Sequence, residues 1–275
     1  MLDNLYILVG LGLGIGTLGT LIGAGGGFIL VPFLILFFPD LQPESITAIS
    51  MAVVAVNAST GSLAYMRSKR IDYKAGIYFA IATIPGSILG VLTTKIIPKH
   101  QFDFIFGIVL ILLAIFLVLK KKKHLDQSSS EFSEKKGLTH QHLVDKEGHA
   151  FTYAYNMKNG ILLAIVVGFF SPLLGIGGGV IHVPAMVEWL QFPVHIATAT
   201  SHFILAIMSS VSVLVHYIEG SYADTTIVKM SLALIVGVIP GALIGAKLSK
   251  KVKGTFIIKA LAISLALVGV RILFS

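Results

Sequence analysis

The sequence of 275 residues contains no cysteine and few charged side chains. Without cysteine the chain can form no disulfide, no thiolate nucleophile and no cysteine-ligated metal centre. Charged residues make up 12% of the chain, hydrophobic residues make up 55%, and the mean hydropathy is +0.90. A soluble core of this size does not need so much apolar surface, and several apolar runs approach the roughly 20 residues that span a bilayer as a helix. The composition therefore predicts an all-α polytopic membrane protein.

Acidic residues are also scarce, with 13 Asp and Glu against 21 Lys and Arg, which gives a net charge of +8. The basic residues gather at the ends of apolar segments, as charges that set membrane topology do, so we expect no nucleic-acid partner. The N-terminus, Met1-Leu2-Asp3-Asn4, lacks the positive region of a signal peptide. We therefore expect the first apolar segment to stay as a membrane helix.

Several catalytic and nucleotide-binding patterns are missing as well. The chain has no P-loop or other nucleotide motif, no His-Glu-x-x-His sequence and no Ser-nucleophile motif. ATP-driven transport by this chain alone is therefore not expected, an enzyme is disfavoured, and no cofactor or metal is predicted.

What the sequence does contain is one glycine motif, written twice. Gly-Ala-Gly-Gly-Gly-Phe-Ile-Leu-Val-Pro at 23–32 recurs as Gly-Ile-Gly-Gly-Gly-Val-Ile-His-Val-Pro at 175–184. Two further blocks recur in the same order, at 47–50 with 198–201 (Thr-Ala-x-Ser) and at 84–90 with 239–245 (Ile-Pro-Gly followed by Gly). The repetition predicts a duplicated chain: a first transmembrane repeat over 1–120, a cytoplasmic linker over 121–157 and a second transmembrane repeat over 158–275.

Each repeat contains about five apolar segments. They are expected at about 4–22, 26–38, 44–66, 75–97 and 102–119, and at about 158–174, 178–190, 194–218, 226–248 and 255–274. The segments that follow the glycines are too short to cross the hydrocarbon layer, so each break predicts either a broken or a re-entrant helix, with ten full crossings as the alternative. In the linker, apolar residues on both sides of Asp145–Gly148 suggest a small β-hairpin.

The basic loops indicate how the repeats are oriented. Arg67, Lys69, Arg70 and Lys74 follow the third segment of the first repeat, whereas the equivalent loop of the second, 219–224, contains no Lys or Arg. There the basic residues come one segment later, from Lys247 onward. Because basic loops face the cytoplasm, this shift predicts that the two repeats are inverted relative to each other, as in many secondary transporters.

Both glycine breaks open a helix, and this predicts where chemistry takes place. The first N–H groups of a helix lack intrahelical partners and lie at the positive end of its dipole, which suits an anion. We therefore expect an oxyanion site formed by Gly25, Gly26, Gly27, Gly177, Gly178 and Gly179. Close helix packing through small residues is the alternative role of these glycines.

Polar side chains inside apolar segments supply the other candidate ligands, because such groups are costly in a membrane without a role. The candidate donors to the substrate are Ser50, Asn57, Thr198 and Ser201. His182 and His202 replace apolar residues of the other repeat, and a histidine that titrates near neutral pH could couple transport to protons. The alternatives are hydroxyls bonded within their own helix and histidines bonded between helices. Pro-Gly-x-x-x-Gly at 85–90 and 240–245 is interpreted as a hinge or packing element.

With both glycine motifs, each followed by Val-Pro, and the Thr-Ala-Thr-Ser block, the chain resembles the sulfite exporter TauE/SafE family of membrane permeases over nearly its whole length. The resemblance implies a multi-pass protein of the bacterial inner membrane that moves a small anion such as sulfite, thiosulfate, a sulfonate or a carboxylate. The motif residues carried over are Gly23, Gly25, Gly26, Gly27, Pro32, Gly175, Gly177, Gly178, Gly179 and Pro184. The expected function is that of a secondary transporter, which His182 or His202 could couple to protons. A passive anion channel is the alternative.

Overall fold

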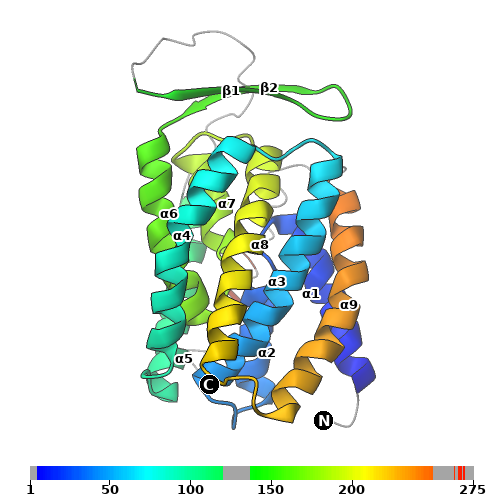
Figure 1. Ribbon diagram of the computed structural model, residues 1–275, viewed down its shortest axis with the longest axis vertical. Coiled ribbons are helices and arrows are strands. Elements are labelled where there is room, and N and C mark those ends of the chain that lie inside the picture. The colour runs from blue at the N-terminus through cyan, green and yellow to red at the C-terminus, as the bar shows by residue number, and fades with distance from the viewer. Residues whose placement is uncertain (1–4, 120–136, 250–262, 264–265, 268, 270–275) are drawn as a thin grey trace.

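The computed structural model describes residues 5–119 and 137–249, together with positions 263, 266, 267 and 269 (Figure 1). These residues form nine named helices and one two-stranded hairpin. In chain order they are α1 (Leu5–Ile22), α2 (Gly27–Phe37), α3 (Pro43–Arg67), α4 (Tyr73–Thr94), α5 (Lys99–Leu119), β1 (Thr139–Val144), β2 (Ala150–Tyr155), α6 (Met157–Leu174), α7 (Gly179–Glu188), α8 (Val194–Ile218) and α9 (Thr225–Ser249).

Within the described part of the chain, six helices are long and apolar enough to cross a membrane: α1, α3, α4, α6, α8 and α9. They confirm the predicted all-α membrane class. The helices that follow the glycine breaks, α2 and α7, are only 11 and 10 residues long. The last apolar segment predicted from the sequence, 255–274, lies outside the described residues apart from four positions.

The first helix of each half packs on the fourth helix of the other half. Gly12 and Gly16 of α1 lie against the backbone of Leu234 and Val238 in α9, so the two helices run in parallel. In the same way α4 runs parallel to α6. The glycines of both Pro-Gly-x-x-x-Gly blocks face a partner backbone: Gly86 faces Ile165 and Phe169 of α6, and Gly241 faces α1. Small residues let these backbones approach closely, which is the packing role predicted for the blocks.

The long helices α3 and α8 lie at the centre of the molecule and run in opposite directions (Figure 1). At one end Ser221, just after α8, donates to the carboxylate of Glu44 in the first turn of α3, at 2.7 Å. At the other end the hydroxyl of Thr200, early in α8, accepts from the backbone N–H of Asp72, just after α3. The short helices are interior as well, since Phe28, Leu30 and Val180 have no exposed surface.

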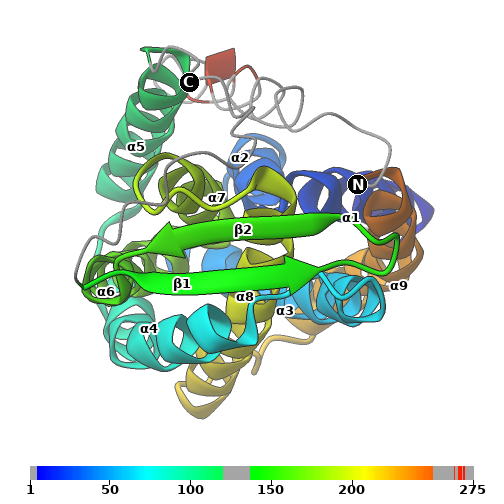
Figure 2. The same cartoon turned by 90° about the horizontal axis from the view of Figure 1, so that it is seen from above.

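The strands β1 and β2 form an antiparallel hairpin with His142 opposite Thr152. The hairpin lies across one end of the helix bundle (Figure 2). Tyr153 and Tyr155 turn inward and pack on Phe192 of the α7–α8 connection, with ring centroids 4.8 and 4.7 Å apart. Tyr153 also donates to Asp72 at 2.7 Å. Burial, with the neighbouring Asp72 carboxylate, raises the pKa of Tyr153. This end of the bundle is called the hairpin end below.

Candidate functional site

The two glycine breaks contain backbone conformations that favour glycine. Gly23, Gly25 and Gly26 have φ of 86°, 77° and 87°, and Gly175 and Gly177 each have φ of 69°. A side chain in this left-handed region is strained, so the repeated glycines follow from the chain path. Residues 23–27 and 175–179 are all buried. Each break therefore places irregular backbone inside the protein, which is where a membrane protein tolerates it.

The two breaks touch each other. A Cβ added to Gly27 would collide with the carbonyl of Gly175, and one added to Gly179 would collide with the carbonyl of Gly23. The added Cβ at Gly179 would also lie 2.7 Å from the Cα of Ala24. The fold thus brings the six predicted site glycines, far apart in the sequence, to one crossing point between the halves.

Six backbone N–H groups at this crossing have no hydrogen-bond acceptor among the described residues. They belong to Gly26, Gly27 and Phe28 at the start of α2 and to Gly177, Gly178 and Gly179 at the start of α7. The N–H groups just before them are satisfied, since those of Ala24 and Gly25 bond to the carbonyl of Gly19. These N–H groups are the ones at the start of a helix that have no intrahelical acceptor, and they lie at the positive end of the helix dipole.

Serines from the central helices satisfy one carbonyl group in each break. The hydroxyl of Ser50 in α3 donates to the carbonyl of Gly175 at 2.6 Å, and that of Ser201 in α8 donates to the carbonyl of Gly23 at 3.4 Å. Each serine thereby holds the break of the opposite half. Because an acceptor is paired in each break while N–H groups stay unpaired, the crossing keeps an excess of donors, which favours an anion.

Asn57 also holds a break. Its Nδ2 donates to the carbonyl of Gly25 at 2.8 Å, and its Oδ1 accepts from the hydroxyl of Thr20 at 2.8 Å. Tyr65 in turn donates to the Thr20 carbonyl at 2.8 Å. Both polar ends of the Asn57 amide are therefore used inside the protein, and its side chain stabilises the first break. The sequence did not single out Thr20 and Tyr65, because nothing in their spacing reveals these long-range partners.

Thr198 contacts the first break through its methyl group and not through a hydrogen bond. Its hydroxyl bonds to the carbonyl of Val194 in its own helix, at 2.8 Å. Its methyl group packs on the first break, where a Cβ at Gly23 would lie 2.8 Å away. Thr47 plays the matching part beside Gly175. This threonine pair shapes the crossing by packing.

The two candidate histidines are fully buried, and neither ring nitrogen of either one has a hydrogen-bond partner among the described residues. His202 in α8 lies against α3, where its ring meets Gly61 and packs edge-on to Tyr65 at a centroid distance of 5.5 Å. His182 lies in α7, and its own backbone N–H bonds to the carbonyl of Gly178 at 2.7 Å. Buried imidazoles without partners are uncommon, because an unpaired polar group is costly there.

Ser171 is a residue that sequence reasoning missed. It lies in the last turn of α6, just before the second break, and its buried hydroxyl has no partner in the part of the chain that the structure describes. A Cβ built on Gly178 would lie 3.3 Å from this hydroxyl. The signal was a serine four residues before the first glycine of the motif, at a position where the first repeat has Gly19.

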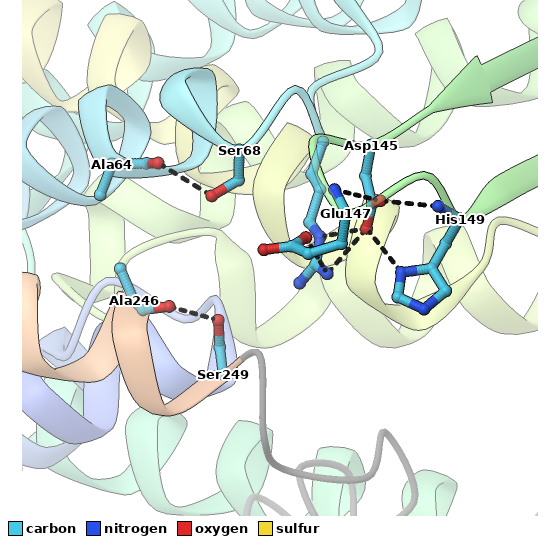
Figure 3. Close-up of polar contacts among 8 residues, drawn as sticks. Ala64, Ser68, Asp145, Glu147, His149, Ala246 and Ser249 are labelled. Atoms are coloured by element: carbon cyan, nitrogen blue, oxygen red, sulfur yellow. Dashed lines mark hydrogen bonds and ion pairs between the residues drawn. The ribbon is translucent and has the colours of Figure 1, made fainter.

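A second polar cluster lies at the hairpin end. Asp145, Glu147 and His149 place potential metal ligands within 4.8 Å of one another in the hairpin turn. Arg70 occupies this cluster, since its guanidinium pairs with Asp145 at 2.8 Å and with Glu147 at 3.0 Å. Asp145 also bonds to His149 (Figure 3). Burial works against ionisation of Asp145, but hydrogen bonds from Arg70 and from the His149 backbone lower its pKa to about 2. The cluster is therefore an ion-pair network that ties the hairpin to the α3–α4 loop.

Another ion pair joins the halves at the opposite end. Lys95, just after α4, contacts the carboxylate of Glu219, just after α8, at 2.7 Å, and lies 3.9 Å from Glu44. The hydrogen bond to Glu219 raises the pKa of Lys95. Polar contacts thus link the halves at both ends of the bundle, while the glycine crossing links them in the middle.

Six apolar spans around two buried, donor-rich helix breaks define a multi-pass membrane protein of the transporter class. The chain belongs to the sulfite exporter TauE/SafE family, whose model matches residues 8–272. It is 36% identical to the probable membrane transporter protein YunE of Bacillus subtilis, over 98% of both chains. It is 28% identical to the probable membrane transporter protein MJ0441 of Methanocaldococcus jannaschii, over 90% of this chain and 87% of the relative. No solved structure matches. The family and the spans place the chain in the cell membrane, as a transporter and not an enzyme.

Proposed function

We propose that the chain is a secondary transporter that moves a small anion, sulfur-containing as in sulfite, thiosulfate or an organosulfonate, across the membrane by alternating access. The single observation that supports an anion is the excess of N–H donors at the glycine crossing, where Ser50 and Ser201 each satisfy one carbonyl. The choice of a sulfur-containing anion rests on the family's name.

The proposed motion rests on an inverted relation between the repeats. Its support is that α3 and α8 run in opposite directions and that α1 pairs with α9 as α6 pairs with α4. An inverted pair can exchange its two conformations and so open the crossing to either side in turn. In this scheme the ion pairs at the two ends of the bundle would open alternately.

The first experiment is a thermal-shift screen of the purified protein with sulfite, thiosulfate, sulfate, methanesulfonate, taurine and lactate. A ligand that binds only the folded state raises the melting temperature in a concentration-dependent way. The proposal expects a saturable rise with at least one sulfur oxyanion. A rise with lactate alone would contradict the sulfur-containing class, and no rise with any anion would contradict the proposed function.

Transport itself distinguishes a carrier from a channel. Proteoliposomes that contain the protein should show saturable uptake of labelled anion and acceleration of uptake by unlabelled anion inside, which is counterflow. Conductance of single molecules far above carrier turnover would instead identify a passive anion channel.

Proton coupling through His182 or His202 is part of the proposal. Its support is that both histidines stand where the other repeat has an apolar residue and that histidine is the side chain whose ordinary pKa lies near neutral pH. Uptake should therefore change when a pH gradient is imposed across the proteoliposome. An unchanged rate would remove proton coupling and leave the anion site untouched.

A further inference from the structure

The two glycine breaks have the same sequence motif but different polar surroundings. Beside the first break stands Asn57 of α3, and the position equivalent to Ser171 is Gly19. Beside the second break stands Ser171 of α6, and the position equivalent to Asn57 is Met208. Each break therefore has one polar neighbour, supplied by a different helix.

The polar neighbour of the first break is fully used. Asn57 bonds to Gly25 and to Thr20. A Cβ at Gly19 would lie 2.7 Å from Nδ2 of Asn57 and 2.6 Å from the backbone nitrogen of Gly26. The amide thus fills the space beside the N–H of Gly26 and leaves no room there even for a methyl group.

The polar neighbour of the second break is unused. Most buried hydroxyls of the long helices bond to a carbonyl of their own helix three or four residues back, as Thr198, Ser209 and Ser231 do. Ser171 does not, although it is fully buried. Its hydroxyl faces Gly178, whose N–H and those of its two neighbours also lack acceptors within the described residues.

We infer that the anion binds at one break only: the Ser171 hydroxyl and the N–H groups of Gly177–Gly179 form its seat, while the first break, held by Asn57, is structural. The inference rests on the proposed function and narrows it. Hydroxyl and amide donors without a fixed positive charge are the chemistry that surrounds a small oxyanion by hydrogen bonds.

The apolar side chains beside Gly178 also restrict the class of ligand that the second break can bind. The other atoms nearest to the Gly178 Cβ position are Cγ1 of Val167, at 2.9 Å, and the Met208 methyl, at 3.4 Å. One side of the seat is therefore polar and the other apolar. A small oxyanion with an unequal surface, such as sulfite with its sulfur lone pair or methanesulfonate with its methyl group, matches these walls better than the evenly charged sulfate ion.

The test measures sulfite and methanesulfonate affinity of purified full-length variants, with sulfate as the comparison anion. Ser171→Ala should weaken binding of both roughly tenfold or more, since a hydrogen bond to a charged group is lost, and should leave the melting temperature without ligand nearly unchanged. Ser171→Thr, which keeps the hydroxyl, should retain more of the affinity. Ser231→Ala, which removes a buried hydroxyl bonded within α9, is the matched control and should bind like the unaltered protein.

A second variant tests the same seat without removing the hydroxyl. Gly178 has φ of −46°, which any residue tolerates, and the atoms nearest to an added Cβ all belong to side chains, with Cγ1 of Val167 closest at 2.9 Å. Gly178→Ala should therefore fold after a small shift of Val167, and its methyl group beside Ser171 should block binding. Asn57→Leu should lower the melting temperature yet keep the affinity of the molecules that fold. Unchanged affinity in both Ser171→Ala and Gly178→Ala, or loss of affinity in folded Asn57→Leu, would overturn the inference while the transporter proposal stands. Failure of the unaltered protein to bind any anion would overturn both.

Discussion

The hydroxyl of Ser50 donates a hydrogen bond of 2.6 Å to the carbonyl of Gly175, which joins the central helix of one half to the glycine break of the other. Ser201 and Gly23 form the matching but longer contact, at 3.4 Å. These serines pair carbonyls that would otherwise lie unpaired in a buried crossing. The sequence suggests these hydroxyls as ligands of an anion. In the structure they instead donate to carbonyl groups of the breaks and so support the site without facing it.

Ser50→Ala should destabilise the fold by about 1–3 kcal/mol, because a buried carbonyl then loses its donor. Ser201→Ala should cost less, since its hydrogen bond is longer. Thermal unfolding in detergent measures both variants, and Ser210→Ala is the control because Ser210 is exposed and bonds within its own helix. Equal melting temperatures for Ser50→Ala and Ser210→Ala would contradict this role for Ser50.

Gly27→Ala and Gly179→Ala should each prevent the two breaks from packing together. An added methyl group would collide with backbone of the opposite break, and backbone cannot move aside as a side chain can. Gly14→Ala is the matched control, since nothing lies within 4 Å of a Cβ placed there. The yield of monodisperse protein and its melting temperature measure the effect. A Gly27→Ala protein as stable as Gly14→Ala would show that the breaks do not form the observed contact.

The hairpin should come away from the α3–α4 loop in acid. The pKa of Asp145 is lowered to about 2 in the folded protein, below the usual value of about 4, so its ionised form stabilises the docked state above pH 4. This stabilisation is lost as the pH falls from about 4 towards 2. Spin labels on cysteines introduced at Arg67 and Lys146, both exposed, report the distance in a chain that has no other cysteine.

Asp145→Asn provides the control for that experiment. It should give an undocked or loosened hairpin at neutral pH and remove most of the change in label distance on acidification, because the buried Arg70 loses its buried charged partner and keeps only the more exposed Glu147. A label distance that changes with pH equally in the variant would mean that another group controls docking.

The sequence predicts the architecture well where the physical cause is local. Glycine triplets followed by Val-Pro locate both breaks, and six of the ten predicted apolar segments match the spans found in the described residues, because propensity and hydropathy act within a short stretch. The hydrogen-bond partners of individual side chains could not be predicted from the sequence. Whether Ser171 stays free or Asn57 holds Gly25 depends on helices more than 30 residues away, so the spacing of residues carries no sign of it.

The two histidines show the same difference between what the sequence predicts and what depends on helix packing. The difference between the repeats reveals His182 and His202, because each stands where the other half has an apolar residue. That both rings are buried without partners depends on how α3, α7 and α8 pack, and this is a property of the assembled structure. The link between Arg70 and Asp145 was equally hidden, since α4, α5 and β1 separate the two residues in the sequence.

The measurement that tests the central claim most directly is counterflow uptake of labelled sulfite into proteoliposomes by the unaltered protein, Gly178→Ala and Gly14→Ala. If the glycine crossing is the anion site of a carrier, the unaltered protein and Gly14→Ala show saturable uptake that internal sulfite accelerates, and Gly178→Ala shows none while it inserts and folds normally. Normal uptake by Gly178→Ala, or uptake by the unaltered protein that neither saturates nor responds to internal sulfite, would contradict the account.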